Sequence, residues 1–69
     1  MSEVKLIILY HANDKMMWLG ITEDQVKRAI LQGAKFKQTE GYLAKYTYIS
    51  VAYRKIDENT YKIKTVFVD

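Results

Sequence analysis

The fold is decided by residues 21–33, which read ITEDQVKRAILQG. Thr22 precedes Gln25 by three positions, the spacing of a capping box in which each side chain bonds the backbone N–H of the other residue. The apolar residues that follow recur at helical spacing and share one face: Val26, Ala29, Ile30 and Gly33. The stretch therefore predicts an amphipathic helix over residues 22–32, with Gly33 ending it.

A strand and a shorter helix are predicted ahead of this helix. Residues 4–10 are rich in β-formers and largely apolar on both faces, the pattern of a strand that is central in a sheet or covered on both sides. Asn13 is a good N-terminal cap, and Gly20 is the residue type that commonly follows a helix. Residues 13–19 are accordingly predicted to form a helix of about two turns.

The hydrophobic period changes to two after the second helix, from Ala34 onward. Residues 42–56 are predicted as one long strand, and Ser50 is one place where so long a strand could bulge. Residues 57–60, DENT, are a turn cluster, and residues 61–68 form the last strand. The resulting order, β-α-α-β-β-β, predicts an α+β fold with two N-terminal helices packed on an antiparallel sheet.

Alternation along the predicted strands assigns their residues to two faces. In the long strand, one face holds Ile49, Val51 and Tyr53, and the other holds Tyr46, Tyr48 and Ala52. In the last strand, one face holds Ile63, Thr65 and Phe67, and the other holds Lys62, Lys64 and Val66.

Length and composition exclude several classes of protein. A chain of 69 residues makes one domain, predicted over residues 1–69. With no Cys and one His, it has no disulfide framework and no zinc site built on Cys or paired His, so no metal and no cofactor are predicted. Its longest apolar run, residues 6–10, is far short of the roughly 20 residues that span a membrane, so no membrane partner is predicted. The absence of Cys favours a cytoplasmic location.

The positive charge lies in the second half of the chain. The formal net charge is +3, and residues 34–69 carry all of it because residues 1–33 are neutral. Four of the six tyrosines also fall between residues 42 and 53. Since basic side chains neutralise phosphates and aromatic rings stack unpaired bases, the following residues are predicted to bind nucleic acid: Lys35, Lys37, Lys45, Tyr46, Lys62 and Lys64. The alternative is structural, because Tyr is a good strand former and Lys keeps an edge strand from aggregating.

His11 is the only histidine and lies where the first strand ends and the first helix begins. A His at such a junction acts as an acid or base near neutral pH, or simply caps the helix. A metal-independent endoribonuclease needs cations on the pentacovalent phosphate and a group that moves a proton. The residues predicted for these catalytic roles are His11, Lys15, Tyr53 and Arg54. No paired carboxylates, glycine-rich phosphate loop or HExxH motif is found.

Two apolar residues of the first helix, Met17 and Trp18, are predicted to form a site for a protein partner. In so small a domain the core cannot cover every large side chain, and an exposed Met–Trp pair marks a docking surface. The alternative is that both residues belong to the core.

Residues 11–22, HANDKMMWLGIT, resemble a motif of a widespread family of small bacterial and archaeal proteins related to the RelE, ParE and BrnT toxins. That motif reads His-Ala-x-x-Arg-Met-x-x-Arg-Gly-Ile-Ser. Residues 65–67, TVF, resemble the Thr-Val-Tyr-like ending of the same family, so the similarity extends over residues 10–67. The resemblance implies a RelE/BrnT-like fold, RNA or the ribosome as target, and an antitoxin-like protein as partner.

The chain departs from the family motif at two positions. Lys15 and Leu19 stand where the family usually has Arg. Lys keeps a point charge but lacks the planar fork that grips a phosphate in two places, and Leu has no charge. Two alternative functions are therefore predicted. The first is a toxin-like protein that contacts RNA through a basic, tyrosine-rich sheet. The second is a non-catalytic module on the same scaffold that binds nucleic acid, a partner protein or a second copy as a homodimer.

Overall fold

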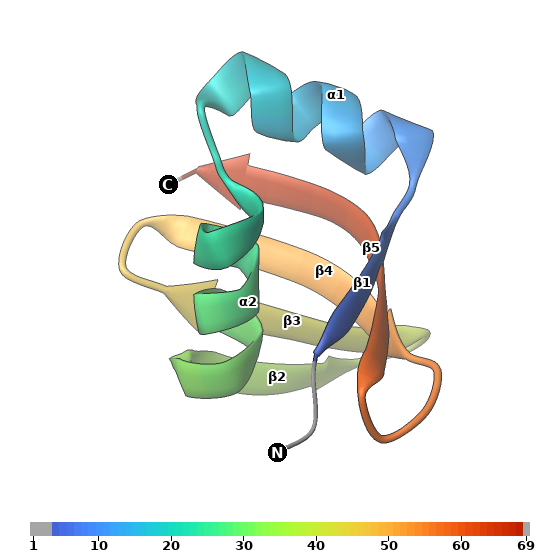
Figure 1. The fold of residues 1–69 in the computed structure, drawn as a ribbon. Helices are drawn as coiled ribbons and strands as arrows, with labels where there is room; N and C mark the ends of the chain where they lie inside the picture. The colour runs from blue at the N-terminus through green and yellow to red at the C-terminus, as the bar shows by residue number, and fades with distance from the viewer. Residues whose placement is uncertain (1–3, 69) are drawn as a thin grey trace.

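Two helices and five strands follow one another in the computed structural model, which describes residues 4–68 (Figure 1). The elements are β1 (Lys5–Ile8), α1 (Tyr10–Leu19), α2 (Glu23–Gln32), β2 (Ala34–Gln38), β3 (Gly41–Tyr46), β4 (Ile49–Lys55) and β5 (Thr60–Val68). The strands form one sheet in the order β1-β5-β4-β3-β2. The predicted α+β class with two N-terminal helices is confirmed. The prediction of a purely antiparallel sheet is wrong, because β1 pairs with β5 in parallel.

The long strand predicted over residues 42–56 is in fact two strands joined by a tight hairpin. Tyr46 pairs with Ile49, so the chain reverses over two residues, Thr47 and Tyr48. Thr47 has a φ of 55°, and its hydroxyl donates to the carbonyl of Tyr46. This loop lacks the Asn-Gly or Gly-x pair that normally announces such a turn, which is why the sequence pattern runs through it. Ser50 pairs regularly with Lys45 and is not a bulge.

β1 lies at the edge of the sheet, whereas its apolar pattern predicts a strand that is central or covered on both sides. Leu6 and Ile8 are partly buried and pack against the core, whereas Ile7 points to the opposite side and is exposed. The pattern is a poor guide here, because burying one apolar face against the core is enough to keep a strand in the sheet. Its second apolar face here remains open to solvent.

α2 follows the sequence prediction closely. The backbone N–H of Gln25 donates to Thr22 Oγ1 over 3.2 Å, and the N–H of Thr22 donates to Gln25 Oε1 over 2.8 Å, so the capping box is confirmed. The apolar face of the helix is buried through Val26, Ala29 and Ile30. Gly33 ends the helix, and a Cβ at this position would lie 2.5 Å from the carbonyl oxygen of Lys45 on β3. A glycine is thus required where the chain passes from α2 into the sheet.

α1 begins three residues earlier than its composition predicts. Its N-cap is Leu9, which makes no side-chain cap bond, and Asn13 lies inside the helix with its amide 3.8 Å from Met17 Sδ. The start is set by chain continuity, since only Leu9 separates β1 from α1. Gly20 ends the helix in the left-handed conformation at φ 73°, as predicted.

The helices and one face of the sheet enclose the core, and α1 lies beside β5 while α2 crosses β3 and β4 (Figure 1). The buried cluster consists of Ala12, Met16, Ile21, Val26, Ala29, Ile30, Ala44, Ile49, Val51, Tyr53, Ile63 and Val66. On β4 the predicted face of Ile49, Val51 and Tyr53 is confirmed. The predicted opposite face is wrong in part: Tyr46 pairs with Ile49 and shares its face, and Tyr48 lies in the turn.

A register shift in the β4–β5 pairing changes which residues of β5 reach the core. Ala52 pairs with Thr65 and Tyr53 pairs with Ile63, so Lys64 has no partner on β4. Residues on the two sides of Lys64 therefore alternate between the faces of the sheet in opposite phase. Ile63 and Val66 are consequently both buried, although they are three residues apart. The prediction that Phe67 shares a face with Ile63 is therefore wrong, and Phe67 is exposed.

Candidate functional site

The charged residues are segregated between the sheet and the rest of the fold. The five strands contain no Asp or Glu. They contain eight of the eleven lysines and arginines of the chain: Lys5, Lys35, Lys37, Lys45, Arg54, Lys55, Lys62 and Lys64. The acids of the described residues lie on the helices and in the turns, namely Asp14, Glu23, Asp24, Glu40, Asp57 and Glu58. The sheet is therefore the positive part of the molecule.

One side of the sheet has no helix against it, and we call this side the open face. Strand register and alternation place on it Lys5, Ile7, Ala34, Phe36, Gln38, Leu43, Lys45, Ser50, Ala52, Arg54, Thr60, Lys62, Thr65 and Phe67. Ala52 is buried by its neighbours but does not belong to the core cluster, which agrees with this assignment. Phe36 is 50% exposed and Phe67 is 42% exposed, so two aromatic rings are accessible on an uncovered sheet.

Four basic side chains lie among these groups, namely Lys5, Lys45, Arg54 and Lys62. Arg54 and Lys62 are direct partners in the pairing of β4 with β5, and Lys45 pairs with Ser50. Like charges placed opposite one another in a sheet are unfavourable, and no strand carries an acid to offset them. The open face therefore attracts anions, and an anion bound between Arg54 and Lys62 would relieve their repulsion.

Two hydroxyl groups lie in the floor of the open face. Ser50 is 2% exposed, and neither its Oγ nor the Oγ1 of Thr65 has a hydrogen-bond partner among the described residues. Buried hydroxyls are normally hydrogen-bonded, because removing them from water without a partner costs about 1–3 kcal/mol. Among the described residues, these two hydroxyls are the buried side-chain polar groups that make no hydrogen bond.

The tyrosines mostly lie on the other, helix-covered face. Tyr42 stacks on Tyr53 with ring centroids 5.8 Å apart, and Tyr61 meets Tyr53 edge-on at 5.6 Å. Burial raises the pKa of Tyr53, and the nearby Tyr61 and Tyr42 raise it further. A cavity of about 280 Å³ adjoins these rings and is lined by Ile30, Lys35, Tyr42, Tyr53, Lys55 and Tyr61. We call it the tyrosine cavity.

The four residues predicted for catalysis do not come together in one cavity. His11 and Lys15 lie on α1 and line a hollow on its outer side. Tyr53 is buried beside the tyrosine cavity, and Arg54, its neighbour in β4, points to the open face. Lys15 alone approaches the open face, where its Nζ lies 4.6 Å from the centroid of the Phe67 ring.

The residues predicted to bind nucleic acid are also divided between the two faces. Lys45 and Lys62 lie on the open face together with Arg54. The register of β2 and β3 places Lys35, Lys37 and Tyr46 on the covered side, and Lys35 Nζ donates to the carbonyl of Gly33 over 3.0 Å. Lys64 lies at the register shift and donates to the carbonyl of Glu40.

Sequence reasoning missed the two phenylalanines of the open face. Phe36 could have been found, because it alternates with Lys35 and Lys37 and so must lie on the face opposite to them. Phe67 could not, because simple alternation groups it with the buried Ile63.

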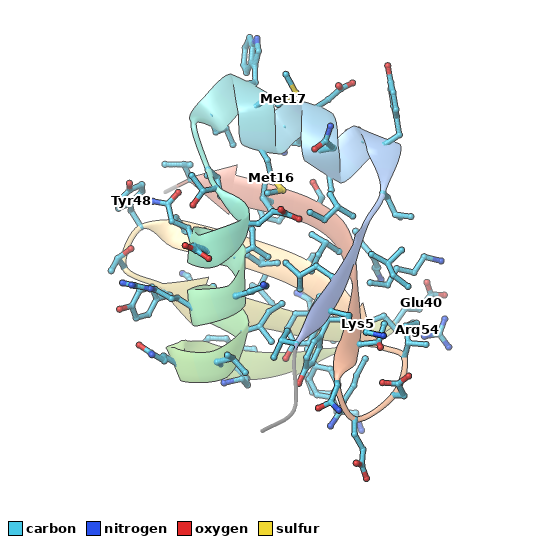
Figure 2. All side chains as sticks on the ribbon, viewed as in Figure 1. Lys5, Met16, Met17, Glu40, Tyr48 and Arg54 are labelled. Carbon is cyan, nitrogen blue, oxygen red and sulfur yellow. The ribbon has the colours of Figure 1, made fainter. Side chains whose placement is uncertain are left out.

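Met17 and Trp18, predicted as a partner site, are both strongly exposed. Figure 2 shows Met16 and Met17 on opposite sides of α1, with Met16 directed toward the sheet and Met17 away from it. The hollow on this outer side is lined by His11, Asp14, Lys15, Met17 and Trp18.

No helix in residues 4–68 is long and apolar enough to cross a membrane. Comparison of the chain with models of known protein families, with curated proteins and with solved structures found no match. The resemblance to the RelE and BrnT toxins therefore stays a prediction from the motif of residues 11–22.

Proposed function

We propose that this protein binds single-stranded RNA on the open face of its sheet, as a toxin-like protein of the RelE/BrnT kind. The observation that carries the proposal is the segregation of charge: the strands hold eight basic residues and no acid. A sheet of this composition, left uncovered and bearing accessible aromatic rings, matches the chemistry of a polyanion with flat bases.

Each part of the open face corresponds to a part of an RNA strand. Phe36 and Phe67 offer rings on which unpaired bases stack, an interaction of about 1–3 kcal/mol per base. The bases of the face neutralise phosphates, and they are Lys5, Lys45, Arg54 and Lys62. Single strands are favoured over duplex, because only unpaired bases present their ring faces to a flat sheet.

Binding is better supported than cleavage. The open face contains no His, Asp or Glu among the described residues, so it has no side chain that moves a proton near neutral pH. His11 lies on α1, and Tyr53 is buried on the covered side. We therefore propose the RNA-binding role without cleavage, and RNA degradation by purified protein would show that a proton carrier reaches the open face from elsewhere.

The test is the binding of a fluorescently labelled single-stranded RNA, followed by anisotropy at low salt. Phe36→Ala and Phe67→Ala are each expected to weaken binding by about 5- to 150-fold, the loss of one stacked base. Tyr48→Ala is the matched control, because Tyr48 is an exposed aromatic residue in the β3–β4 turn, off the open face. Affinities that are equal in all three variants and the unmodified protein would overturn the proposal, and a gel of the same RNA after incubation reports cleavage.

A further inference from the structure

The outer side of α1 carries a second apolar face that nothing in the described chain covers. One side of the helix is buried through Ala12 and Met16. The other side exposes Tyr10 at 82%, Met17 at 75% and Trp18 at 90% of their surface. A helix that is apolar on two sides is normally covered on both, and a cluster of large exposed apolar groups marks an interaction site.

This outer side is hollowed, and its lining is both apolar and charged. The hollow has a volume of about 580 Å³ and is lined by His11, Asp14, Lys15, Met17 and Trp18. The wall therefore combines one acid, one lysine and one histidine with two large apolar side chains. With nearly balanced charge, the hollow does not suit a strongly acidic or strongly basic partner.

The order of these residues along α1 makes the surface complementary to itself. A two-fold axis between positions 14 and 15 of two antiparallel helices sets Asp14 against Lys15 of the second copy. The same operation sets Trp18 against His11 of the second copy, so that each indole enters the hollow of the other helix. Every contact then occurs twice, as an isologous interface requires.

We propose that the outer side of α1 is the interface of a two-fold homodimer of this chain. The occupant of each hollow is Trp18 of the second copy, held by the two Asp14–Lys15 ion pairs. A helix of 10 residues is only about 15 Å long, so the dimer is small and dissociates on dilution. The proposal does not depend on RNA binding, since the hollow lies on α1 and only Lys15 also reaches the open face, where its Nζ lies 4.6 Å from the centroid of the Phe67 ring.

Sedimentation equilibrium over a range of concentrations tests the dimer, and the single tryptophan of the chain reports the same event. The emission of Trp18 is expected to shift to shorter wavelength as concentration rises, because the exposed indole becomes buried. Trp18→Ala is expected to weaken dimerisation by about thirtyfold or more, as for a buried aromatic anchor.

A charge swap separates this interface from any other. Asp14→Lys and Lys15→Asp should each weaken the dimer, since each places like charges together, and the double variant should restore it. Lys27→Glu on α2 is the control for a change of charge away from the interface. Thermal denaturation of each variant verifies that it remains folded. A protein that stays monomeric at all concentrations overturns the proposal, as does a dimer that is insensitive to Trp18→Ala or is not restored by the double swap.

Discussion

Replacing Arg54 and Lys62 together by glutamine tests the electrostatic basis of the open face. The two residues are direct partners in the β4–β5 pairing, and glutamine keeps a polar side chain at both positions. Because like charges in direct opposition repel, the double variant should be as stable as the unmodified protein or more stable by up to about 1 kcal/mol. A change in RNA binding could then not be attributed to unfolding.

The magnitude of the binding change follows from the number of phosphates that the open face neutralises. For single-stranded nucleic acid, each neutralised phosphate contributes about −0.7 to the slope of log K against log salt concentration. The four bases of the open face therefore give a slope of about −2.8, and the two that remain in the variant, Lys5 and Lys45, give about −1.4. Between about 50 and 200 mM salt, affinity should fall about fiftyfold in the unmodified protein and about sevenfold in the variant.

The assay is an anisotropy titration of labelled single-stranded RNA at four or more salt concentrations. The matched control is Lys35→Gln with Lys37→Gln, which removes the same charge from positions of β2 on the covered side. Its slope should stay near that of the unmodified protein. If the two double variants change the slope equally, attraction is a property of net charge alone and the assignment to the open face is refuted.

Two further predictions concern stability. Thr22→Ala removes the acceptor of the Gln25 N–H bond and should lower the free energy of unfolding, measured in urea, by about 1 kcal/mol. Thr22→Ser keeps a hydroxyl acceptor and should retain most of that stability. Equal urea midpoints for the two variants would contradict the capping argument. Because burial raises the pKa of Tyr53 above its ordinary value of 10.0, the folded protein keeps this proton where the unfolded chain loses it. The contribution of Tyr53 to stability should therefore be fully present below pH 10.0 and be lost as the pH rises above it. Tyr53→Phe should make the loss of stability with pH shallower. An unchanged pH dependence in Tyr53→Phe would show that Tyr53 contributes nothing to the loss.

Signals that lie within a few residues of one another were read correctly from the sequence. The capping box of Thr22 and Gln25 and the left-handed end at Gly20 depend on hydrogen bonds and φ values within one turn of helix. The buried face of α2 follows from the spacing of its apolar residues. Asn13 is not the cap, because the short link from β1 makes α1 begin at Tyr10 and so places Asn13 inside the helix. The capping preference of Asn carries no information about that link.

The candidate site was only partly readable, because it depends on which way each strand residue points. The concentration of positive charge in residues 34–69 is a property of composition and was evident at once. Its division between two faces was not, since Lys35 and Lys37 lie on the covered side while Lys45, Arg54 and Lys62 lie on the open face.

Local sequence signals are enough to predict the α+β class, the second helix with both of its ends, and the basic character of residues 34–69. Three features are set by the packing of the whole chain: the parallel pairing of β1 at the sheet edge, the hairpin at Thr47, and the bulge that leaves Lys64 unpaired in β5. The physical reason is the two-residue period of a strand, in which one unpaired residue moves every later side chain to the opposite face. Through that single shift Val66 entered the core and Phe67 joined the open face.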